Sequence, residues 1–402
     1  MLVLSYWLYR AVAILMLNAL IAFACFELAG LAYFKIKIPT IKSEPTEQLV
    51  GEENSPREKI SYYASQDWAE RYWHEFRLSR KQQFYPFVGW RRAPFKGKTI
   101  EVDENGVRVT PGADCSPKSF KVFTFGASEM WGTGSPNWAT IPAHLQNGLE
   151  RLKQGPVCVT NFAESAYVSL QNVIMLLMQL RMGNVPDVVV FYTIADNVYA
   201  AYQTGRVGTL ENNDLIAARF EGRREPDTFV DRLKNTYSYQ FIDMLMGKLT
   251  IASPQQAQSS PPKLITYESM GIDAATLSDL LVQEYVENYE IVSALSQKYG
   301  FKYFFFLPPD VTLSSKPLTS EEQEMKRRAE TEAALYKLST AVYQRMEREA
   351  PKYQNLYSML HVFDPYDSLM FIDAGHVTPI GNQLSAERML EVTQARSIAA
   401  DE

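Results

Sequence analysis

The chain has 402 residues, 46% of them hydrophobic and 21% charged, a composition that excludes a disordered chain and suffices for one large domain or two ordinary ones. Its net charge of −6, without a long block of Lys and Arg, argues against a nucleic-acid partner. The three cysteines, Cys25, Cys115 and Cys158, lack metal-ligand spacing, so we expect no structural metal and no cofactor. Cys115 and Cys158 would pair as a disulfide if this part of the chain is exported; two free thiols are the alternative.

The N-terminal segment is strongly apolar. Residues Ala11–Phe34 are nearly continuous in apolar side chains, with Asn18 as the main polar interruption before Glu27. As a helix this run would extend about 36 Å, and a bilayer's hydrocarbon core is about 30 Å thick. We therefore predict a single-pass transmembrane anchor within residues 1–38. A cleaved signal peptide is the alternative, although the apolar run continues past the small residue Ala24.

The charges around this segment do not fix its orientation. Arg10 precedes it, and Lys35, Lys37 and Lys42 follow it, a small excess that leans toward a cytoplasmic body. An exported body is the alternative. It suits the substrate class predicted below, and we take it as the expected location of the catalytic domain. The sequence does not indicate an oligomeric state.

Two short regions precede the main domain. Residues 39–61 are polar and rich in Pro and Glu, which predicts a linker. Residues 62–118 form a predicted extension, with a short helix marked by Trp68, Tyr72 and Phe76 at mixed helical spacing. Asn105-Gly106 between extended segments predicts a β-hairpin in the same region.

Residues 119–402 alternate between short apolar runs and helical patterns. The predicted strands are Val122–Phe125, Val157–Phe162, Val188–Tyr192, Tyr303–Leu307 and Met359–Phe363. The predicted helices are Ile141–Leu152, Leu170–Met182, Leu277–Tyr299, Ser320–Glu349 and Pro379–Ala395. This alternation predicts an α/β fold with a parallel sheet covered by helices on both faces. An insertion, residues 205–275, interrupts the pattern and is either a lid over the site or a surface elaboration.

The predicted site combines a serine with a distant histidine. Ser128 follows a buried strand that ends at Gly126, the arrangement of a nucleophile held on a turn. A serine hydroxyl needs a base, and among the four histidines His376 lies on a glycine-containing turn just before a helix. Asp373, three residues earlier, can accept a hydrogen bond from the His376 Nδ1 and fix its tautomer. These residues predict an ester-cleaving serine enzyme.

Four ordered segments resemble the SGNH/GDSL-like hydrolase family over roughly residues 120–395. They are Phe125-Gly-Ala-Ser128 with Gly132, Val159–Ser169, Val188–Tyr199, and Asp373-Ala-Gly-His376 with Gly381-Asn382. The resemblance implies a three-layer α/β/α fold with a five-stranded parallel sheet. It also implies a Ser128 nucleophile, a His376 base oriented by Asp373, and an oxyanion hole. The hole would combine the Ser128 N–H, a second-segment N–H and a third-segment Asn side chain.

Two positions depart from the family pattern. Ala166 replaces the usual Gly of the second segment, and its N–H can serve if φ is negative. Asp196-Asn197 reverses the usual Asn-Asp order of the third segment. Three accounts follow: a one-residue shift brings Asn197 into the hole, Asp196 acts as a protonated donor, or the site is weakened. The first is the expectation.

The substrate expectation is an O-acyl or O-acetyl ester, carried by an envelope glycan or a lipid. It rests on the predicted anchor and on the family resemblance. An acyltransferase that uses the same residues is the first alternative, and a catalytically silent anchored scaffold or glycan-binding module is the second. Glu129 directly follows the nucleophile and either stabilises the start of a helix or meets the substrate.

Overall fold

The computed structural model describes residues 2–37, 55–153, 155–213, 216–217 and 266–398. The chain divides into two units, one formed by Met1–Pro45 with Leu215–Lys263 and the other by Thr46–Asp214 with Leu264–Glu402. Most of the predicted linker and most of the predicted insertion lie outside the described residues, and nothing there tests the lid. The α/β fold belongs to the second unit.

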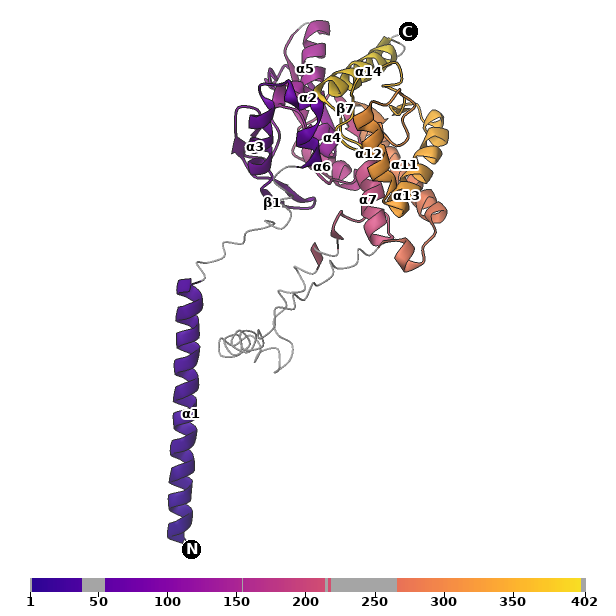
Figure 1. The fold of residues 1–402 in the computed structure, drawn as a ribbon. Coiled ribbons are helices and arrows are strands. Elements are labelled where there is room, and N and C mark those ends of the chain that lie inside the picture. Colours follow the sequence, from indigo (N-terminus) through magenta and orange to yellow (C-terminus); the bar gives the residue numbers. More distant parts are fainter. Residues whose placement is uncertain (1, 38–54, 154, 214–215, 218–265, 399–402) are drawn as a thin grey trace. The chain divides into compact units, whose positions relative to one another are not determined.

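Apart from residues 216–217, the described part of the first unit is one helix. α1 runs from Leu2 to Lys37 (Figure 1) and contains the predicted span Ala11–Phe34. Across the ranges that the structure describes, no helix meets the combined requirement of length and apolar character for crossing a membrane.

The second unit is built on a five-stranded parallel sheet, which confirms the predicted fold class. Its strands are β5 Phe120–Gly126, β6 Val157–Asn161, β7 Val188–Tyr192, β8 Lys302–Leu307 and β9 Leu356–Ser358. Their order in the sheet is β6-β5-β7-β8-β9. The chain adds β6 on one side of β5 and then β7, β8 and β9 on the other, so the direction in which strands are added reverses at β5. Doubly wound folds place their sites at the carboxyl ends of the strands around such a point.

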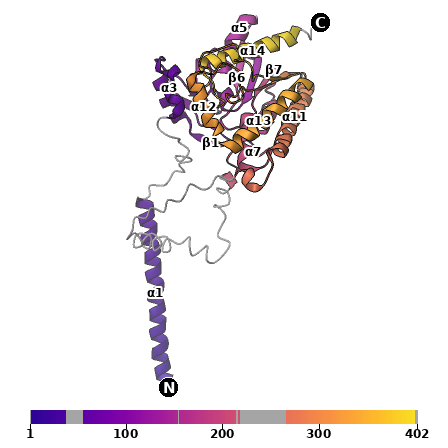
Figure 2. The ribbon, with the colours of Figure 1, turned by 45° about the vertical axis from the view of Figure 1, so that its right-hand side comes forward.

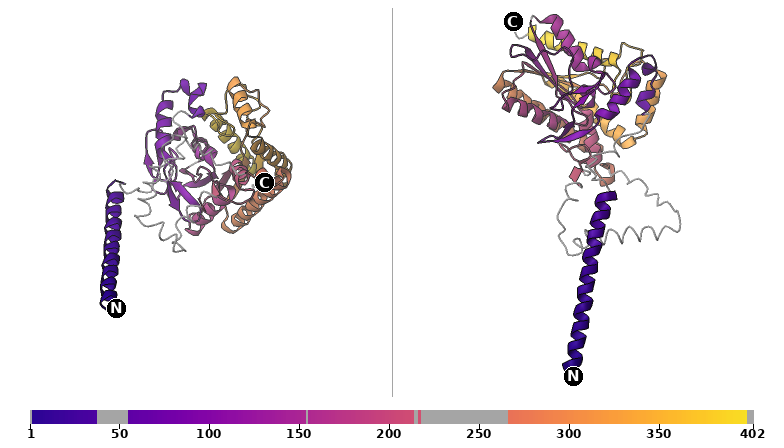
Figure 3. Two further views of the ribbon diagram at one scale, coloured as in Figure 1. Left: turned by 60° about the horizontal axis from the view of Figure 1, so that its bottom comes forward. Right: turned by 90° about the vertical axis from the view of Figure 1, so that its left-hand side faces the viewer.

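Helices cover both faces of the sheet (Figures 2 and 3). On one face α5 Ile141–Leu152 packs against α14 Pro379–Ile398. On the other, α11 Ala274–Tyr299 packs against α6 Ser169–Arg181 and α13 Ala333–Glu349, and α13 contacts α7 Ala195–Thr204. Because successive strand residues point to opposite faces, Phe191 and Phe305 enter one core while Val190 and Phe304 enter the other.

The remaining elements are short. They are α2 Ser61–Ala64, α3 Ala69–Ser79, β1 Gln82–Tyr85, β2 Gly89–Arg92, β3 Phe95–Lys96, β4 Glu101–Val102, α4 Ser128–Trp131, α12 Ser320–Glu330 and the 3-10 turns η2 Pro56–Lys59, η3 Asn137–Ala139, η4 Glu268–Met270 and η5 Ala350–Lys352. β1 pairs with β2 and β3 with β4, each antiparallel, and Val102 bridges Arg108 around the predicted Asn105-Gly106 turn. These strands and α3 form the extension expected before the main domain.

Two predicted elements are wrong in detail. The fifth strand is Leu356–Ser358 instead of Met359–Phe363, because the ladder with β8 ends at Ser358 and the apolar residues after it are buried in a turn. His361 consequently lies in that turn, exposed and paired with Asp364, and not inside a strand. The single helix predicted over Ser320–Glu349 breaks at Glu332, whose ψ of 65° is not helical.

Candidate active site

Ser128 stands where β5 passes into α4. A Cβ at Gly126 would collide with the Tyr192 carbonyl oxygen of the neighbouring strand, so glycine permits the close approach of β5 and β7 at this point. Ser128 is the first residue of α4, which ends after one turn at Gly132 with φ +98°. The first N–H groups of a helix have no partner inside the helix, so the Ser128 N–H remains available as a donor.

His376 joins Ser128 from a distant part of the chain. The loop that carries His376 is closed by an antiparallel bridge between Phe371 and Val377 and by a 2.9 Å hydrogen bond from the Ile372 N–H to the His376 carbonyl. The ring Nε2 lies 2.8 Å from the Ser128 Oγ. With its Nδ1 proton held elsewhere, this Nε2 can accept the hydroxyl proton.

Asp373 holds the other side of the ring. Its Oδ2 and Oδ1 lie 2.8 Å and 3.0 Å from the His376 Nδ1. The backbone N–H groups of Gly375 and His376 donate to Oδ1 at 3.0 Å and 2.8 Å, which fixes the carboxylate. The structure therefore brings the three residues Ser128, His376 and Asp373 together in the predicted order.

Arg57 adds a charge that sequence reasoning missed. Its Nε forms an ion pair with the Asp373 Oδ2. Burial by itself would raise the pKa of Asp373, but the charges of Arg57 and His376 and the hydrogen bonds from His376 outweigh burial and lower it. The lowered pKa keeps Asp373 a carboxylate at neutral pH. Arg57 lies in η2, within the region predicted to be a linker, where no pattern marks it.

Glu129 faces the site from inside the protein. It is 8% exposed, and its Oε2 has no hydrogen-bond partner among the described residues. A Cβ at Gly375, beside His376, would lie 3.6 Å from the Glu129 Oε1. Burial raises the pKa of Glu129, although the charge of His376 opposes the shift. Glu129 sits in the first turn of α4 as expected, but its carboxyl group points to the triad loop instead of to solvent.

Asp196 and Glu211 form a pair of carboxyl groups. Asp196 lies in the first turn of α7 and is hydrogen-bonded to Glu211. Burial, followed by the charges of Glu129 and Glu211, raises the pKa of Asp196 well above its ordinary value. The same causes, burial and then Glu129, raise the pKa of Glu211 to about 7. Two adjacent carboxyl groups cannot both ionise cheaply, so this pair keeps a proton at neutral pH.

Asn197 does not occupy the predicted position. Its Nδ2 donates to the Ser169 Oγ at 2.7 Å and to the Glu284 Oε2 at 3.0 Å, and its Oδ1 accepts from the Ser169 N–H at 2.9 Å. Both amide hydrogens are therefore used in the core between α6 and α11. The one-residue shift expected from the sequence is wrong, because consecutive helix residues point about 100° apart.

Ala166 has the left-handed backbone conformation that favours glycine. Its φ is +65°, so the condition of a negative φ is not met. An alanine in this left-handed region costs about 1–2 kcal/mol. The Ala166 N–H donates no hydrogen bond within the described chain, whereas the Tyr167 N–H closes the turn onto the Glu164 carbonyl at 3.3 Å. The strained turn leaves the Ala166 N–H unused.

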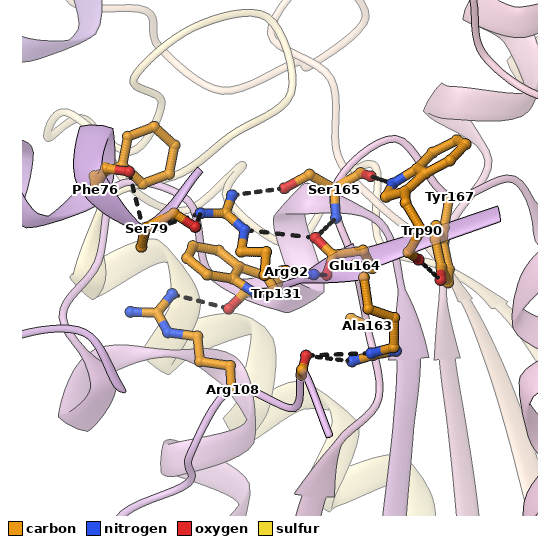
Figure 4. Close-up of polar contacts among 12 residues, drawn as sticks. Phe76, Ser79, Trp90, Arg92, Arg108, Trp131, Ala163, Glu164, Ser165 and Tyr167 are labelled. Atoms are coloured by element: carbon orange, nitrogen blue, oxygen red, sulfur yellow. Dashed lines mark hydrogen bonds and ion pairs between the residues drawn. The ribbon is translucent and has the colours of Figure 1, made fainter. Parts of the chain in front are cut away.

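The extension supports this turn from outside (Figure 4). Arg92 and Glu164 form a buried ion pair at 3.5 Å, with side chains 4% and 0% exposed. The Arg92 Nη2 also donates to the Ser165 Oγ at 3.0 Å, and the Arg92 N–H donates to the Glu164 Oε2 at 2.8 Å. Figure 4 shows the Arg92 and Arg108 guanidinium groups on opposite sides of Trp131, 3.6 Å and 4.1 Å from its ring centroid.

These contacts make the extension part of the site. Trp131 is the last residue of α4, the helix that begins at Ser128, and Arg92 links it to the turn of Ala166. One buried arginine thus contacts both the helix that begins at Ser128 and the residue that precedes Ala166. In the sequence, the signal of this contact is the pair of adjacent arginines Arg91 and Arg92 in a short strand.

Cys115 and Cys158 form a disulfide, with Cα atoms 4.8 Å apart. This decides between the two alternatives left open by the sequence. Cys158 lies in the edge strand β6 and Cys115 in the segment that precedes β5, so the bond links that segment to the edge of the sheet. Within the described ranges, no group of three or more His, Cys, Asp or Glu side chains is arranged to hold a metal ion.

Comparison with known proteins gives structural matches alone. No protein-family profile and no curated protein sequence matches the chain. Among solved structures, the lipase Lip_vut3 from a goat rumen metagenome is 13% identical, covers 68% of this chain and 97% of its own, and has a TM-score of 0.37. The acetyl xylan esterase AlAXEase is 12% identical, with 67% and 98% coverage and a TM-score of 0.36.

A third match is a G-D-S-L family lipolytic protein, described as putative, from Desulfitobacterium hafniense DCB-2, at 9% identity, 68% and 99% coverage and a TM-score of 0.34. These overall superpositions are weak. In fold, with its five-stranded parallel sheet, the chain resembles the SGNH/GDSL-like hydrolases.

Proposed function

We propose that this protein is a serine hydrolase that cleaves carboxylic esters. The observation that carries the proposal is the unbroken series from Asp373 through the His376 ring to the Ser128 hydroxyl, with 2.8 Å at each step. Asp373 is held as a carboxylate by Arg57 and by backbone N–H groups, so it stabilises the imidazolium that forms when His376 takes a proton.

The reaction has two halves. The Ser128 Oγ bonds to the ester carbonyl carbon as its proton passes to the His376 Nε2, and the carbonyl oxygen becomes an oxyanion. The C–O bond to the alcohol then breaks, and the alcohol leaves with the proton from His376. Water enters by the same route: His376 accepts a proton from it and the hydroxide portion adds to the acyl carbon. The bond from that carbon to the Ser128 Oγ then breaks, the Oγ takes the proton back from His376, and a carboxylic acid leaves.

We infer that the oxyanion is held by the N–H groups of Ser128 and Ala166 together with a protonated Asp196. The raised pKa of Asp196 supports a neutral acid at pH 7, which donates a hydrogen bond where an ionised one would repel the oxyanion. The φ of Ala166 is not the negative value expected from the sequence, but its N–H makes no other hydrogen bond among the described residues, which supports its role as the second donor. One such donor is worth about 10²–10³ in rate.

The proposed substrate is an O-acyl or O-acetyl ester carried by an envelope glycan, with an acylated lipid as the alternative. We also propose an exported location for the α/β unit. The Cys115–Cys158 disulfide supports this location, because such bonds persist in oxidising compartments. Proteolysis of intact cells tests the location: an exported domain is cleaved by added protease, and a cytoplasmic one is protected.

Two other functions use the same fold. An acyltransferase would pass the acyl group from Ser128 to an acceptor alcohol, and product analysis with an added glycan acceptor separates it from a hydrolase. A catalytically silent binding protein is favoured by one observation, the carboxyl groups of Glu129, Asp196 and Glu211 gathered beside the site. If these groups are ionised in the presence of substrate, they oppose an oxyanion.

Hydrolysis of p-nitrophenyl acetate and butyrate by the purified full chain tests the proposed function. Wild type releases nitrophenol, and Ser128→Ala abolishes the release. Ser296→Ala is a matched control, since Ser296 lies in the last turn of α11, at the edge of the sheet opposite the strand carboxyl ends. Activity that survives Ser128→Ala would refute the proposed nucleophile.

A further inference from the structure

The tip of the hairpin formed by β1 and β2 exposes two phenylalanine rings. Phe84 is 75% exposed and Phe87 is 82% exposed, more than any other large apolar side chain in the described part of the α/β unit. The paired residues end at Tyr85 opposite Gly89, so Phe87 lies at the centre of the connecting loop. A single exposed apolar side chain is ordinary, whereas large apolar side chains grouped at one place indicate an interaction surface.

Phe87 holds a backbone conformation that disfavours its own side chain. Its φ is +68°, in the left-handed region, where a bulky residue is an outlier and glycine would fit without strain. Because the ring lies in solvent, packing within the described chain does not offset this strain. Strained positions of this kind concentrate where a side chain meets a ligand, so the ring of Phe87 points to a role outside the fold.

The base of the hairpin is fixed to the turn that contains Ala166. Val88 is fully buried, and its carbonyl oxygen accepts a hydrogen bond from the Gln171 Nε2 at 2.6 Å. The Trp90 Nε1 donates to the Ser165 carbonyl oxygen at 3.1 Å (Figure 4). The hairpin therefore presents its two exposed rings from a fixed base beside the candidate active site.

The segment that carries the hairpin is basic. Residues 81–100 contain five basic side chains and no Asp or Glu, in a chain whose net charge is −6. Glu75 and Glu164, which contact this segment, are used inside the fold: Glu75 accepts from backbone N–H groups, and Glu164 pairs with Arg92. The exposed basic side chains of the segment are Lys81, Lys96 and Lys98.

We propose that this hairpin binds the surface of a lipid bilayer containing anionic lipids, with Phe84 and Phe87 inserted at the level of the headgroups. Rings at that depth remove apolar surface from water, and each lysine near an anionic surface raises the affinity roughly fivefold. Lys81 lies about 10 Å behind Phe84 along β1, at 3.3 Å per residue, where it meets lipid phosphates. A neutral glycan also binds aromatic rings, but it gives the exposed lysines no charged partner.

A dye attached at the tip of the hairpin tests this binding in the full chain. Cys25 is the free cysteine beside the Cys115–Cys158 disulfide, so Cys25→Ser with Phe87→Cys leaves one thiol for a nitrobenzoxadiazole dye. On vesicles of phosphatidylcholine mixed with phosphatidylglycerol, the dye emission should shift to shorter wavelength and be quenched by spin-labelled lipid. Vesicles of phosphatidylcholine alone should give a smaller shift, because the lysines then lack an anionic partner.

A second dye position controls for attachment through another part of the chain. Leu152 is 55% exposed at the end of α5, shortly before β6 begins at Val157, and so lies at the sheet edge opposite the strand carboxyl ends. The dye on Leu152→Cys with Cys25→Ser should emit as in buffer. A dye on Phe87→Cys that emits as in buffer, or an equal shift at both positions, overturns the proposal. A shift caused by xylan and not by vesicles also overturns it, and assigns the tip to a glycan.

Phe87→Gly separates the role of the ring in binding from a role in folding. Glycine relieves the left-handed strain and removes no buried contact, so the urea midpoint of unfolding should not fall. With the dye on Phe84→Cys in the Cys25→Ser chain, Phe87→Gly should lose most of the emission shift, and Lys81→Gln with Lys96→Gln should reduce it. A Phe87→Gly protein that unfolds at a clearly lower urea concentration would show that the fold needs the ring and would contradict the proposal. These measurements read out the hairpin whether or not the protein cleaves an ester.

Discussion

The His376 Nε2 lies 2.8 Å from the Ser128 Oγ, although 248 positions separate the two residues in the chain. Ser128 follows β5 and His376 lies in the turn before α14, and both lie at the same edge of the sheet. Such a contact is what proton transfer from a serine requires, and the surrounding charges determine how well it works.

Asp373→Asn should lower kcat about 10⁴-fold with little change in KM. The amide cannot stabilise the imidazolium and holds the ring in the wrong tautomer. Steady-state kinetics on p-nitrophenyl butyrate measure the loss. Asp364→Asn, which removes the carboxylate partner of His361 in an exposed turn, is the matched control. If Asp373→Asn keeps wild-type kcat, Asp373 does not orient the base.

Asp196 gives the activity a limit at alkaline pH. Burial raises the pKa of Asp196, and that of its partner Glu211 to about 7, so the shared proton is present at low pH and is lost as the pH rises past this range. Wild-type kcat should therefore fall on the alkaline side, once the pH rises past the range in which Asp196 keeps its proton. Asp196→Asn supplies a donor that does not titrate, and kcat should then persist at pH 9. A pH–rate profile for the two proteins decides the matter, and identical alkaline limbs would contradict a protonated Asp196.

Removal of one partner of the Arg92–Glu164 pair should lower the free energy of unfolding more than replacement of both partners. Arg92→Met leaves Glu164 as an uncompensated buried charge and should lower the free energy of unfolding by about 3–5 kcal/mol. Arg92→Met with Glu164→Gln should lose less than Arg92→Met alone. Urea denaturation measures wild type, Arg92→Met, Glu164→Gln and the double variant. A double variant as unstable as the sum of both single variants would mean that the two side chains do not interact.

The disulfide should contribute about 2–4 kcal/mol, since it closes a loop between positions 43 residues apart. Cys115→Ser with Cys158→Ser should unfold at lower urea concentration than wild type. Dithiothreitol should destabilise wild type and leave the double variant unchanged. Cys25→Ser controls for the loss of a free thiol. Wild type that is insensitive to reductant would show that the bond adds no stability.

The sheet could be predicted because its central strands are short runs of buried β-branched and aromatic residues. The runs at Val122–Phe125 and Val188–Tyr192 lie inside β5 and β7. The edge strand β9 escaped prediction because only Leu356, Tyr357 and Ser358 pair with β8, and the more apolar residues follow in a turn.

The site was predictable where residues lie close in sequence or at strand ends, as for Ser128, Asp373 and His376. The direction in which a side chain points could not be predicted from the sequence. Asp196 and Asn197 are neighbours on α7, yet one pairs with Glu211 and the other turns to Ser169, a difference set by helix phase. Arg57 reaches Asp373 from a polar segment more than three hundred positions away, and no local pattern records such a contact.

Labelling of the full chain with a fluorophosphonate, followed by peptide mass spectrometry, tests the central claim most directly. The probe reacts with a serine only where a base activates it. The account predicts one adduct, on Ser128, that is lost in His376→Gln while the fold, measured by circular dichroism, is retained. A folded wild-type protein that carries no adduct on Ser128, or an equal adduct in His376→Gln, would contradict it.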